Sequence, residues 1–283
     1  MTEARTIRCD DAEITYDVHG DLTSGVPLLV IGSPMGASGF AALVEQLPGR
    51  PVVTYDPRGV ERSTKDDPST VNTAERHAAD LQRVVEDLGV DQVDVFASSG
   101  GAVVALAWVS AGGPLRTLVA HEPPIIALLP DREHATAVTQ RMNDTYDREG
   151  FGPAMAQFIA LVMHQGPFTA ADLAAPAPDP AMFGLPSEDD GTRTDALLWQ
   201  NRPITAWEPD LDRLKTTSTR IVPGIGEQSR TILTGRATVA LAEQLGLEPV
   251  WFPGGHGGFG PDDGSGMGGD PAAFAAKLRE VLE

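Results

Sequence analysis

The feature that most constrains the fold is a stretch in which a strand-forming run passes directly into a helix-forming run. Residues 93–98 read VDVFAS and residues 100–106 read GGAVVAL, with only Ser99 between them. The chain must therefore turn within about two residues, which leaves Ser99 in a strained conformation. Strand and helix nearly touch at such a turn, so small residues are needed two positions before and after it, and Ala97 and Gly101 supply them. The pattern predicts a Ser99 hydroxyl exposed beside the free N–H groups of a helix that begins at Gly100.

The same residues have a simpler interpretation, in which Ser98 to Gly101 is an ordinary polar turn with a serine N-cap. The rest of the chain has to decide between the two.

Composition limits the classes of function. The chain has 283 residues, 41% apolar and 22% charged, which suits a globular protein with one large domain or a domain carrying an insertion. A formal charge of −19 argues against nucleic acids and anionic membrane surfaces as partners. Cys9 is the only cysteine, so neither an intramolecular disulfide nor a thiolate metal cluster is expected. Residues 1–5 lack a signal-peptide pattern and no apolar run reaches about 20 residues, so we expect a cytoplasmic protein.

The order of apolar segments predicts an α/β fold. Residues 6–9 and 13–19 form an edge hairpin, and buried strands at 27–31, 52–55, 93–98 and 115–120 follow. They alternate with helices expected at 40–47, at about 73–88 and from Gly100 onward. Residues 132–149, 152–164 and 192–206 are predicted to be helical with no strand between them. The alternation resumes with a strand at 220–222, a helix at 237–245 and a strand at 248–252. We therefore expect a mostly parallel sheet flanked by helices, formed by residues 1–125 and 210–283, with a helical cap over residues 126–209 inserted after the strand that precedes Glu122.

A nucleophilic serine requires a base, and the base requires an acid that orients it. His256 lies between two pairs of glycines, after the last strand and before the last helix, where its ring can project over the end of the sheet. His19, His77, His134 and His164 lie on an edge strand, on an amphipathic helix or in the cap, where structural or solvated roles are expected.

With these residues assigned, the chain resembles the α/β-hydrolase family along nearly its whole length. Four features match the family in order: Gly32-Ser33-Pro34 at the oxyanion loop, Asp56-x-Arg58-Gly59-x-x-x-Ser63, Ala97-x-Ser99-x-Gly101 at the nucleophile turn, and the His256 loop. The segment from Val119 to Pro124, which contains His-Glu-Pro-Pro, is similar to a subgroup of actinobacterial hydrolases of unassigned substrate. Ile31 stands where many members have histidine, so that side chain does not support the loop here. Asp56 is expected to hold its own loop together through Arg58.

The resemblance implies a serine hydrolase that needs no metal or organic cofactor. His256 would remove the proton of Ser99, and the N–H groups of Ser33 and Gly100 would stabilise the oxyanion. The acid is the main departure, because Ser229 stands where members often carry aspartate. Glu122 keeps the order serine, acid, histidine and is favoured, although it could instead be a buried carboxylate that ties the cap to the core. Glu227 lies in the usual loop but two residues early, and is the alternative acid.

The expected reaction is cleavage of an ester, thioester, lactone or amide of a small apolar molecule. Two other functions stay open: a cofactor-independent cyclase or lyase of secondary metabolism, and a catalytically silent ligand-binding protein. The aromatic residues of the expected cap favour an apolar or aromatic ligand: Phe151, Phe158, Phe168, Phe183, Trp199 and Trp207. The sequence leaves a homodimer open and does not define the oligomeric state.

Overall fold

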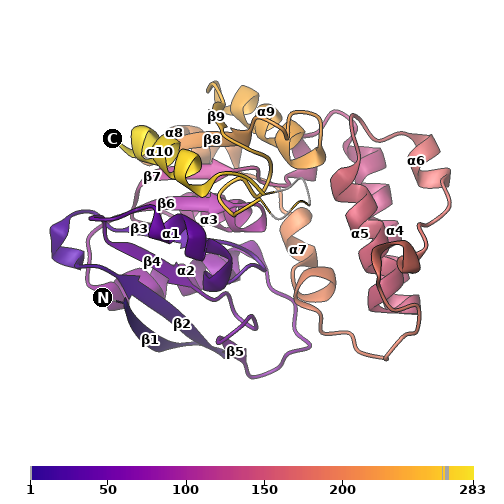
Figure 1. Ribbon diagram of the computed structural model, residues 1–283, viewed down its shortest axis with the longest axis horizontal. Coiled ribbons are helices and arrows are strands. Elements are labelled where there is room, and N and C mark those ends of the chain that lie inside the picture. The colour runs from indigo at the N-terminus through magenta and orange to yellow at the C-terminus, as the bar shows by residue number, and fades with distance from the viewer. Residues whose placement is uncertain (1, 263, 265–267) are drawn as a thin grey trace.

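A mostly parallel sheet forms the centre of the molecule (Figure 1). The computed structural model describes residues 2–262, 264 and 268–283. In spatial order the strands are β1 (Thr2–Cys9), β2 (Ala12–His19), β4 (Val52–Tyr55), β3 (Leu28–Ile31), β6 (Val93–Ser98), β7 (Leu115–His121), β8 (Arg220–Gly226) and β9 (Val250–Phe252). The β1–β2 hairpin pairs antiparallel with β4, and all neighbours from β4 to β9 are parallel. The predicted α/β class with a mostly parallel sheet is confirmed.

Helices cover both faces of the sheet. One face packs against α1 (Ala41–Glu45) and α10 (Pro271–Leu282), and the other packs against α2 (Ala74–Leu88), α3 (Gly100–Ser110), α8 (Leu211–Thr216) and α9 (Leu233–Leu245). Successive side chains of β3 alternate between the two cores, because a strand turns every second residue to the same face. Leu28 and Val30 pack with the α1 and α10 side, whereas Leu29 and Ile31 pack with the α2 and α3 side. Burial on both faces explains why these strands read as continuous apolar runs.

Local signals fix the ends of α2, which packs against α3. Thr73 is the N-cap, and its Oγ1 accepts a hydrogen bond from the Arg76 amide at 3.2 Å. Gly89 ends the helix in the left-handed conformation, with φ of 67°, which glycine adopts without strain. The helix therefore begins one residue after the predicted start and ends where the sequence indicated.

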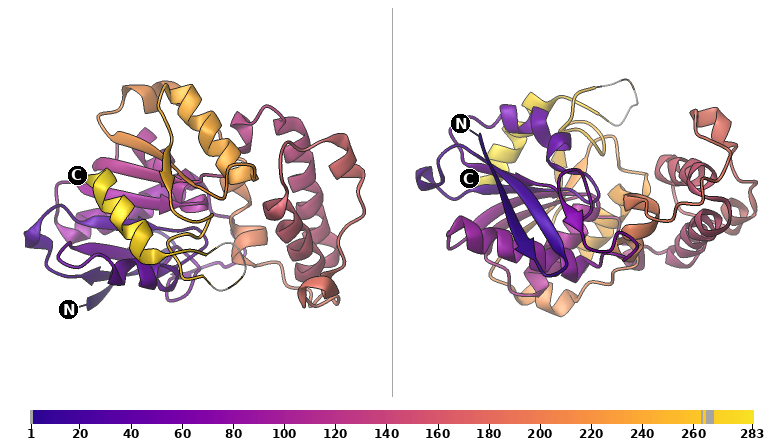
Figure 2. Two further views of the ribbon diagram at one scale, coloured as in Figure 1. Left: turned by 45° about the horizontal axis from the view of Figure 1, so that its top comes forward. Right: turned by 90° about the horizontal axis from the view of Figure 1, so that it is seen from below.

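Between β7 and β8 the chain forms helices and turns but no strand. This helical segment (residues 126–209) contains η3 (Ile126–Leu128), α4 (Arg132–Glu149), α5 (Phe151–Met163), α6 (Ala170–Ala174), η4 (Pro180–Phe183), the π-helical turn η5 (Ala196–Gln200) and α7 (Arg202–Thr205). Figures 1 and 2 show α4, α5 and α6 grouped to one side, with α7 between them and the sheet. Within the described ranges, no helix has the length and apolar character needed to cross a bilayer.

Several local predictions were wrong. The helix expected over residues 192–206 begins only at Ala196, because the Asp195 carboxylate caps it by accepting hydrogen bonds from the amides of residues 197 and 198. It is then broken at Asn201, before Pro203. Proline supplies no N–H group for a continuous helix. The helix expected over residues 40–47 is the 3-10 turn η2 (Ala37–Phe40) followed by the short α1. The loop after β4 contains the short strand β5 (Thr64–Lys65), which pairs with β2. The turn η1 (Leu22–Ser24) was also not foreseen.

Candidate active site

The strained turn expected at Ser99 is present. Ser99 lies between the last residue of β6 and the first residue of α3, with φ of 56° and ψ of −128°. Non-glycine residues rarely adopt a positive φ, so the surrounding contacts must hold this conformation. A Cβ on Gly101 would lie 2.5 Å from the Ile31 carbonyl oxygen, and a Cβ on Gly100 would lie 2.5 Å from the Ser33 carbonyl oxygen. The small residues after the serine are therefore required by the close approach of the loop that follows β3.

Glu122 occupies a second strained position, at the end of the neighbouring strand β7. Its φ is 51°, and its side chain is 0% exposed. Oε1 accepts a hydrogen bond from the Gly226 amide at 2.8 Å, and Oε2 accepts from Thr234 Oγ1 at 2.7 Å and lies 2.6 Å from His256 Nδ1. Burial by itself would raise the pKa of Glu122, but the hydrogen bond from His256 and the nearby imidazole charges lower it to about 2. The carboxylate is therefore ionised near neutral pH.

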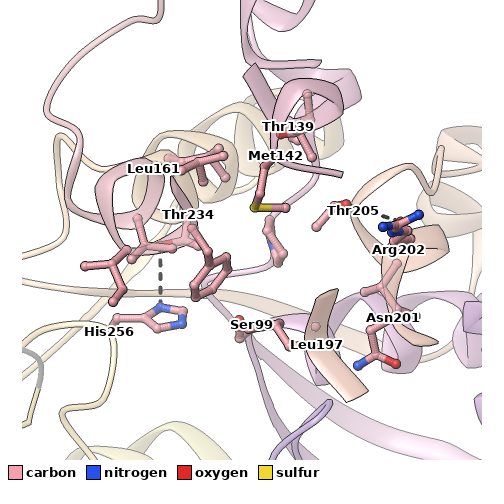
Figure 3. Close-up of a pocket in the computed structure, with 18 of the residues that line it drawn as sticks. Ser99, Thr139, Met142, Leu161, Leu197, Asn201, Arg202, Thr205, Thr234 and His256 are labelled. Atoms are coloured by element: carbon pink, nitrogen blue, oxygen red, sulfur yellow. Dashed lines mark hydrogen bonds between the residues drawn. The ribbon is translucent and has the colours of Figure 1, made fainter. Parts of the chain in front are cut away.

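His256 joins this carboxylate to the pocket that contains Ser99. Figure 3 shows His256 and Ser99 among the residues that line one pocket, with Thr234 above the imidazole. When Nδ1 of a neutral imidazole donates to a carboxylate, Nε2 carries the lone pair and can accept a proton. Among the described residues, Ser99 Oγ makes no hydrogen bond with His256. In enzymes that use such a pair, this bond often tightens only in the complex with substrate.

The two candidate acids have different surroundings. The Glu227 side chain is exposed and makes no hydrogen bond to a described residue, while its amide donates to the Phe252 carbonyl at 3.0 Å. Ser229, at the position where family members often carry aspartate, is buried and close enough to Glu122 to contribute to its lowered pKa, without the geometry of a hydrogen bond. The structure thus brings together Ser99, Glu122 and His256, and leaves Glu227 outside this group.

The candidate oxyanion donors lie side by side at the pocket wall. Gly100 is the first residue of α3, so no carbonyl of the helix can accept its N–H. Ser33 follows Gly32 at the end of β3, and both Ser33 and Gly100 line the pocket. The amide Nδ2 of Asn201 donates to Ser33 Oγ at 2.8 Å, which connects the helical segment to this loop.

The pocket has a volume of about 390 Å³ and lies between the sheet and the helical segment. Most of the side chains that the helical segment contributes are apolar, among them Met142, Met155, Phe158, Ile159, Leu161 and Val162. Among the described lining residues, Arg202 is the only arginine, and none is a lysine, aspartate or glutamate. Its guanidinium forms an ion pair with Asp147 at 2.8 Å, donates to the Leu198 carbonyl at 2.7 Å and stacks 4.8 Å from the centre of the Trp199 ring. Because this charge is already paired, the pocket offers an almost uncharged, apolar surface.

Sequence reasoning did not identify Thr234 or Asn201. Thr234 lies in the first turn of α9, which was expected to begin at residue 237, so the pattern placed it in a loop. Asn201 follows the π-helical turn η5, and no sequence motif signals such a turn. The Gly226 amide was also missed, because a main-chain donor leaves no trace in the side-chain pattern.

The prediction that Asp56 pairs with Arg58 was wrong. Arg58 is buried and forms ion pairs with Asp80 at 2.6 Å and Asp11 at 2.9 Å. Asp56 instead accepts a hydrogen bond from Arg62 Nε at 2.6 Å and one from the backbone amide of residue 37 at 2.8 Å. Asp56 therefore fixes the far end of the loop that contains Ser33, while Arg58 ties the loop that follows β4 to α2. Sequence spacing cannot tell which of two nearby arginines reaches the carboxylate.

His121, adjacent to Glu122, is an aromatic core residue. Its ring is buried among Phe96, Phe252, Phe259 and Phe274, with ring centroids 5.4–6.3 Å apart. Burial lowers the pKa of His121 to about 4, so the ring is neutral near neutral pH. Among the described lining residues of the pocket, His256 is the only histidine.

The chain belongs to the alpha/beta hydrolase fold family, whose model matches residues 27–244. An uncharacterized hydrolase, YraK, from Bacillus subtilis (strain 168) is 28% identical over 260 residues, covering 90% of this chain and 89% of the relative. Among solved structures, a thermophilic esterase from Thermogutta terrifontis is 19% identical, with a TM-score of 0.66 and coverage of 99% of this chain and 98% of that one. The N-acyl homoserine lactonase AidH, complexed with N-butanoyl homoserine, is 19% identical with a TM-score of 0.64 and coverage of 99% and 96%. The chain is thus an enzyme of the serine hydrolase type.

Proposed function

We propose that this enzyme cleaves an ester, thioester, lactone or amide of a small, uncharged, apolar molecule through an acyl-enzyme formed on Ser99. The observation that carries this proposal is the 2.6 Å contact between His256 Nδ1 and the buried Glu122 carboxylate, beside the strained serine and in the same pocket. A buried carboxylate that holds one imidazole nitrogen leaves the other free to act as a base. Glu122, and not Glu227, is the proposed acid.

The proposed reaction has two stages. In the first, His256 accepts the Ser99 proton, Ser99 Oγ attacks the carbonyl carbon, and the protonated imidazole then gives its proton to the leaving group. The N–H groups of Ser33 and Gly100 stabilise the negative oxygen, and loss of one such donor typically raises a barrier by about 2.7–4 kcal/mol. In the second stage, water loses a proton to His256 and attacks the acyl carbon, and Ser99 regains its proton as the acid leaves.

The lining of the pocket supports an uncharged substrate. No carboxylate lies among the described lining residues, so a substrate ammonium group would find no counter-charge, and the single guanidinium is already paired with Asp147. Burial of an unpaired charge costs far more than burial of an apolar chain. The structural neighbours include an esterase and an N-acyl homoserine lactonase, and cleavage of an ester or a lactone is among the proposed reactions. We also propose that residues 126–209 act as a cap that selects substrates by size.

Covalent labelling with a fluorophosphonate, followed by intact mass, tests the proposal. The wild type should gain one phosphonyl group, Ser99→Ala should gain none, Glu122→Gln should react at least 100-fold more slowly, and Glu227→Gln should react like the wild type. Slowing confined to Glu227→Gln would move the acid to the loop after β8. An unlabelled wild type, or a wild type that turns over its substrate without adding water, would refute the hydrolase mechanism.

A further inference from the structure

The Ser33 side chain has a hydrogen-bonding capacity that the backbone mechanism does not use. Ser33 is only 7% exposed and lines the pocket. A serine hydroxyl has one hydrogen to donate and two lone pairs that accept. Among the described residues, the Nδ2 group of Asn201 is the hydrogen-bond partner of Ser33 Oγ, at 2.8 Å, and it occupies a lone pair. The hydroxyl hydrogen of Ser33 is therefore available to a group in the pocket.

Ser33 lies against the turn that carries Ser99. The backbone of Ser33 packs so closely on Gly100 that a Cβ on Gly100 would lie 2.5 Å from the Ser33 carbonyl oxygen. Gly100 directly follows Ser99, and Ser33, Ser99 and Gly100 all line the same pocket.

Asn201 is held rigidly enough to orient a hydroxyl. Asn201 is 6% exposed and follows η5, and its backbone N–H donates to the Ala196 carbonyl at 3.1 Å. The preceding residue, Gln200, anchors this turn to the core: its carbonyl accepts from the Asn72 amide at 2.6 Å, and its Oε1 accepts from Lys65 Nζ at 3.2 Å. These contacts fix where the Asn201 side chain meets Ser33.

We propose that the Ser33 hydroxyl is a third donor to the oxyanion, and that Asn201 is a positioning residue that orients this hydroxyl from the helical segment. This inference rests on the proposed function, because it assumes that Ser99 attacks a carbonyl. It adds a side-chain donor to the two backbone donors, and it makes the oxyanion site depend on correct docking of residues 196–205 against the core.

The experiment compares second-order rates of fluorophosphonate labelling, in which negative charge develops on the phosphoryl oxygen, for four variants of the full chain. Ser33→Ala keeps the backbone N–H but removes the hydroxyl, and should react about 100-fold more slowly, as for loss of one oxyanion donor. Asn201→Ala should react more slowly than the wild type, and adding it to Ser33→Ala should cause no further loss, because Asn201 acts only through Ser33. In Asn201→Asp the carboxylate would accept the Ser33 hydrogen, so the loss should equal or exceed that of Ser33→Ala.

Ser110→Ala is the matched control, because Ser110 lies at the far end of α3 and its buried hydroxyl has no described hydrogen-bond partner. It should label at the wild-type rate. With an ester that the enzyme turns over, Ser33→Ala should lower kcat and leave KM unchanged, because the third donor is engaged in the transition state. A merely structural role would instead lower the Tm and change both constants.

The outcomes separate this inference from the proposed function. A wild type that is not labelled overturns both. A labelled wild type with Ser33→Ala within threefold of its rate overturns only the third donor, and additive losses in the double variant overturn the role of Asn201. If Ser33→Ala fails to fold, Asn201→Asp decides: an unchanged labelling rate overturns the inference, and a loss of about 100-fold supports it.

Discussion

Replacement of Glu122 by glutamine removes the charge of the proposed acid while it keeps the side-chain volume. The neighbours of this side chain determine what the substitution does. The Gly226 amide, 2.8 Å from Oε1, can only donate, so the carbonyl oxygen of the glutamine must face Gly226. The glutamine NH₂ group then faces His256, whose Nδ1 lies 2.6 Å from the other carboxylate oxygen in the wild type.

This arrangement reverses the tautomer of the imidazole. Nδ1 would have to accept a hydrogen bond from the glutamine, so the hydrogen would move to Nε2, which then could not remove a proton from Ser99. A wrong tautomer together with loss of the buried charge costs about 10⁴-fold in kcat in enzymes of this mechanism. That factor corresponds to about 5.4 kcal/mol in the barrier, at about 1.36 kcal/mol per tenfold change.

Steady-state hydrolysis of a p-nitrophenyl ester measures this effect directly. We expect Glu122→Gln to lower kcat by about 10³- to 10⁴-fold, and Glu227→Gln, as the matched control on an exposed side chain, to stay within twofold of the wild type. More than a tenth of the wild-type kcat in Glu122→Gln, with an unchanged Tm, would refute the assignment of the acid and the tautomer argument with it.

Three further predictions follow from other parts of the structure. Burial lowers the pKa of His77 to about 3 and that of His121 to about 4, so below pH 6.5 the unfolded chain binds protons that the folded chain does not. The free energy of unfolding should therefore fall by roughly 2 kcal/mol for each of these histidines between pH 8 and pH 5. In urea titrations, His77→Leu should remove about half of that decline. In Gly101→Ala the new methyl group would lie 2.5 Å from a carbonyl oxygen of β3, so the free energy of unfolding in the same titration should fall by about 2 kcal/mol or more. In Gly260→Ala the nearest atom is 3.4 Å away, so this control should leave the free energy of unfolding nearly unchanged. Met142→Trp, which fills the pocket, should lower kcat/KM for hexanoate esters more than for acetate esters, and equal losses for both would contradict the proposed acyl site.

Much of the fold could be predicted from the sequence because the strongest signals in the sequence are local. Alternating apolar runs and helical periods were enough to predict a mostly parallel sheet flanked by helices. The turn at Ser99 follows from the absence of any loop between strand and helix. The same local reasoning failed at residues 192–206, where the helix begins only after the Asp195 cap and is broken before Pro203.

The candidate site was harder to derive because part of it consists of contacts between distant segments. Ser99 and His256 carry recognisable flanking residues, whereas Thr234 and Asn201 are ordinary polar residues in the sequence. They become informative only when folding places them 2.7 Å from Glu122 and 2.8 Å from Ser33, respectively. The pairing of Asp56 with Arg62 rather than Arg58 has the same cause, since two arginines of equal charge differ only in their three-dimensional position.

The anchoring of η5 by Lys65 and Asn72 bears on how this enzyme could be re-engineered. The outer helices α4 and α5 contribute mostly apolar surface to the pocket, so a shorter or longer hairpin could be grafted in their place to change the size of the accepted acyl group. The junction of such a graft should lie before residue 195, because η5 and α7 are hydrogen-bonded to the core through Gln200 and Asn201. A chimera that also exchanged these two turns would lose contacts that reach the loop at Ser33.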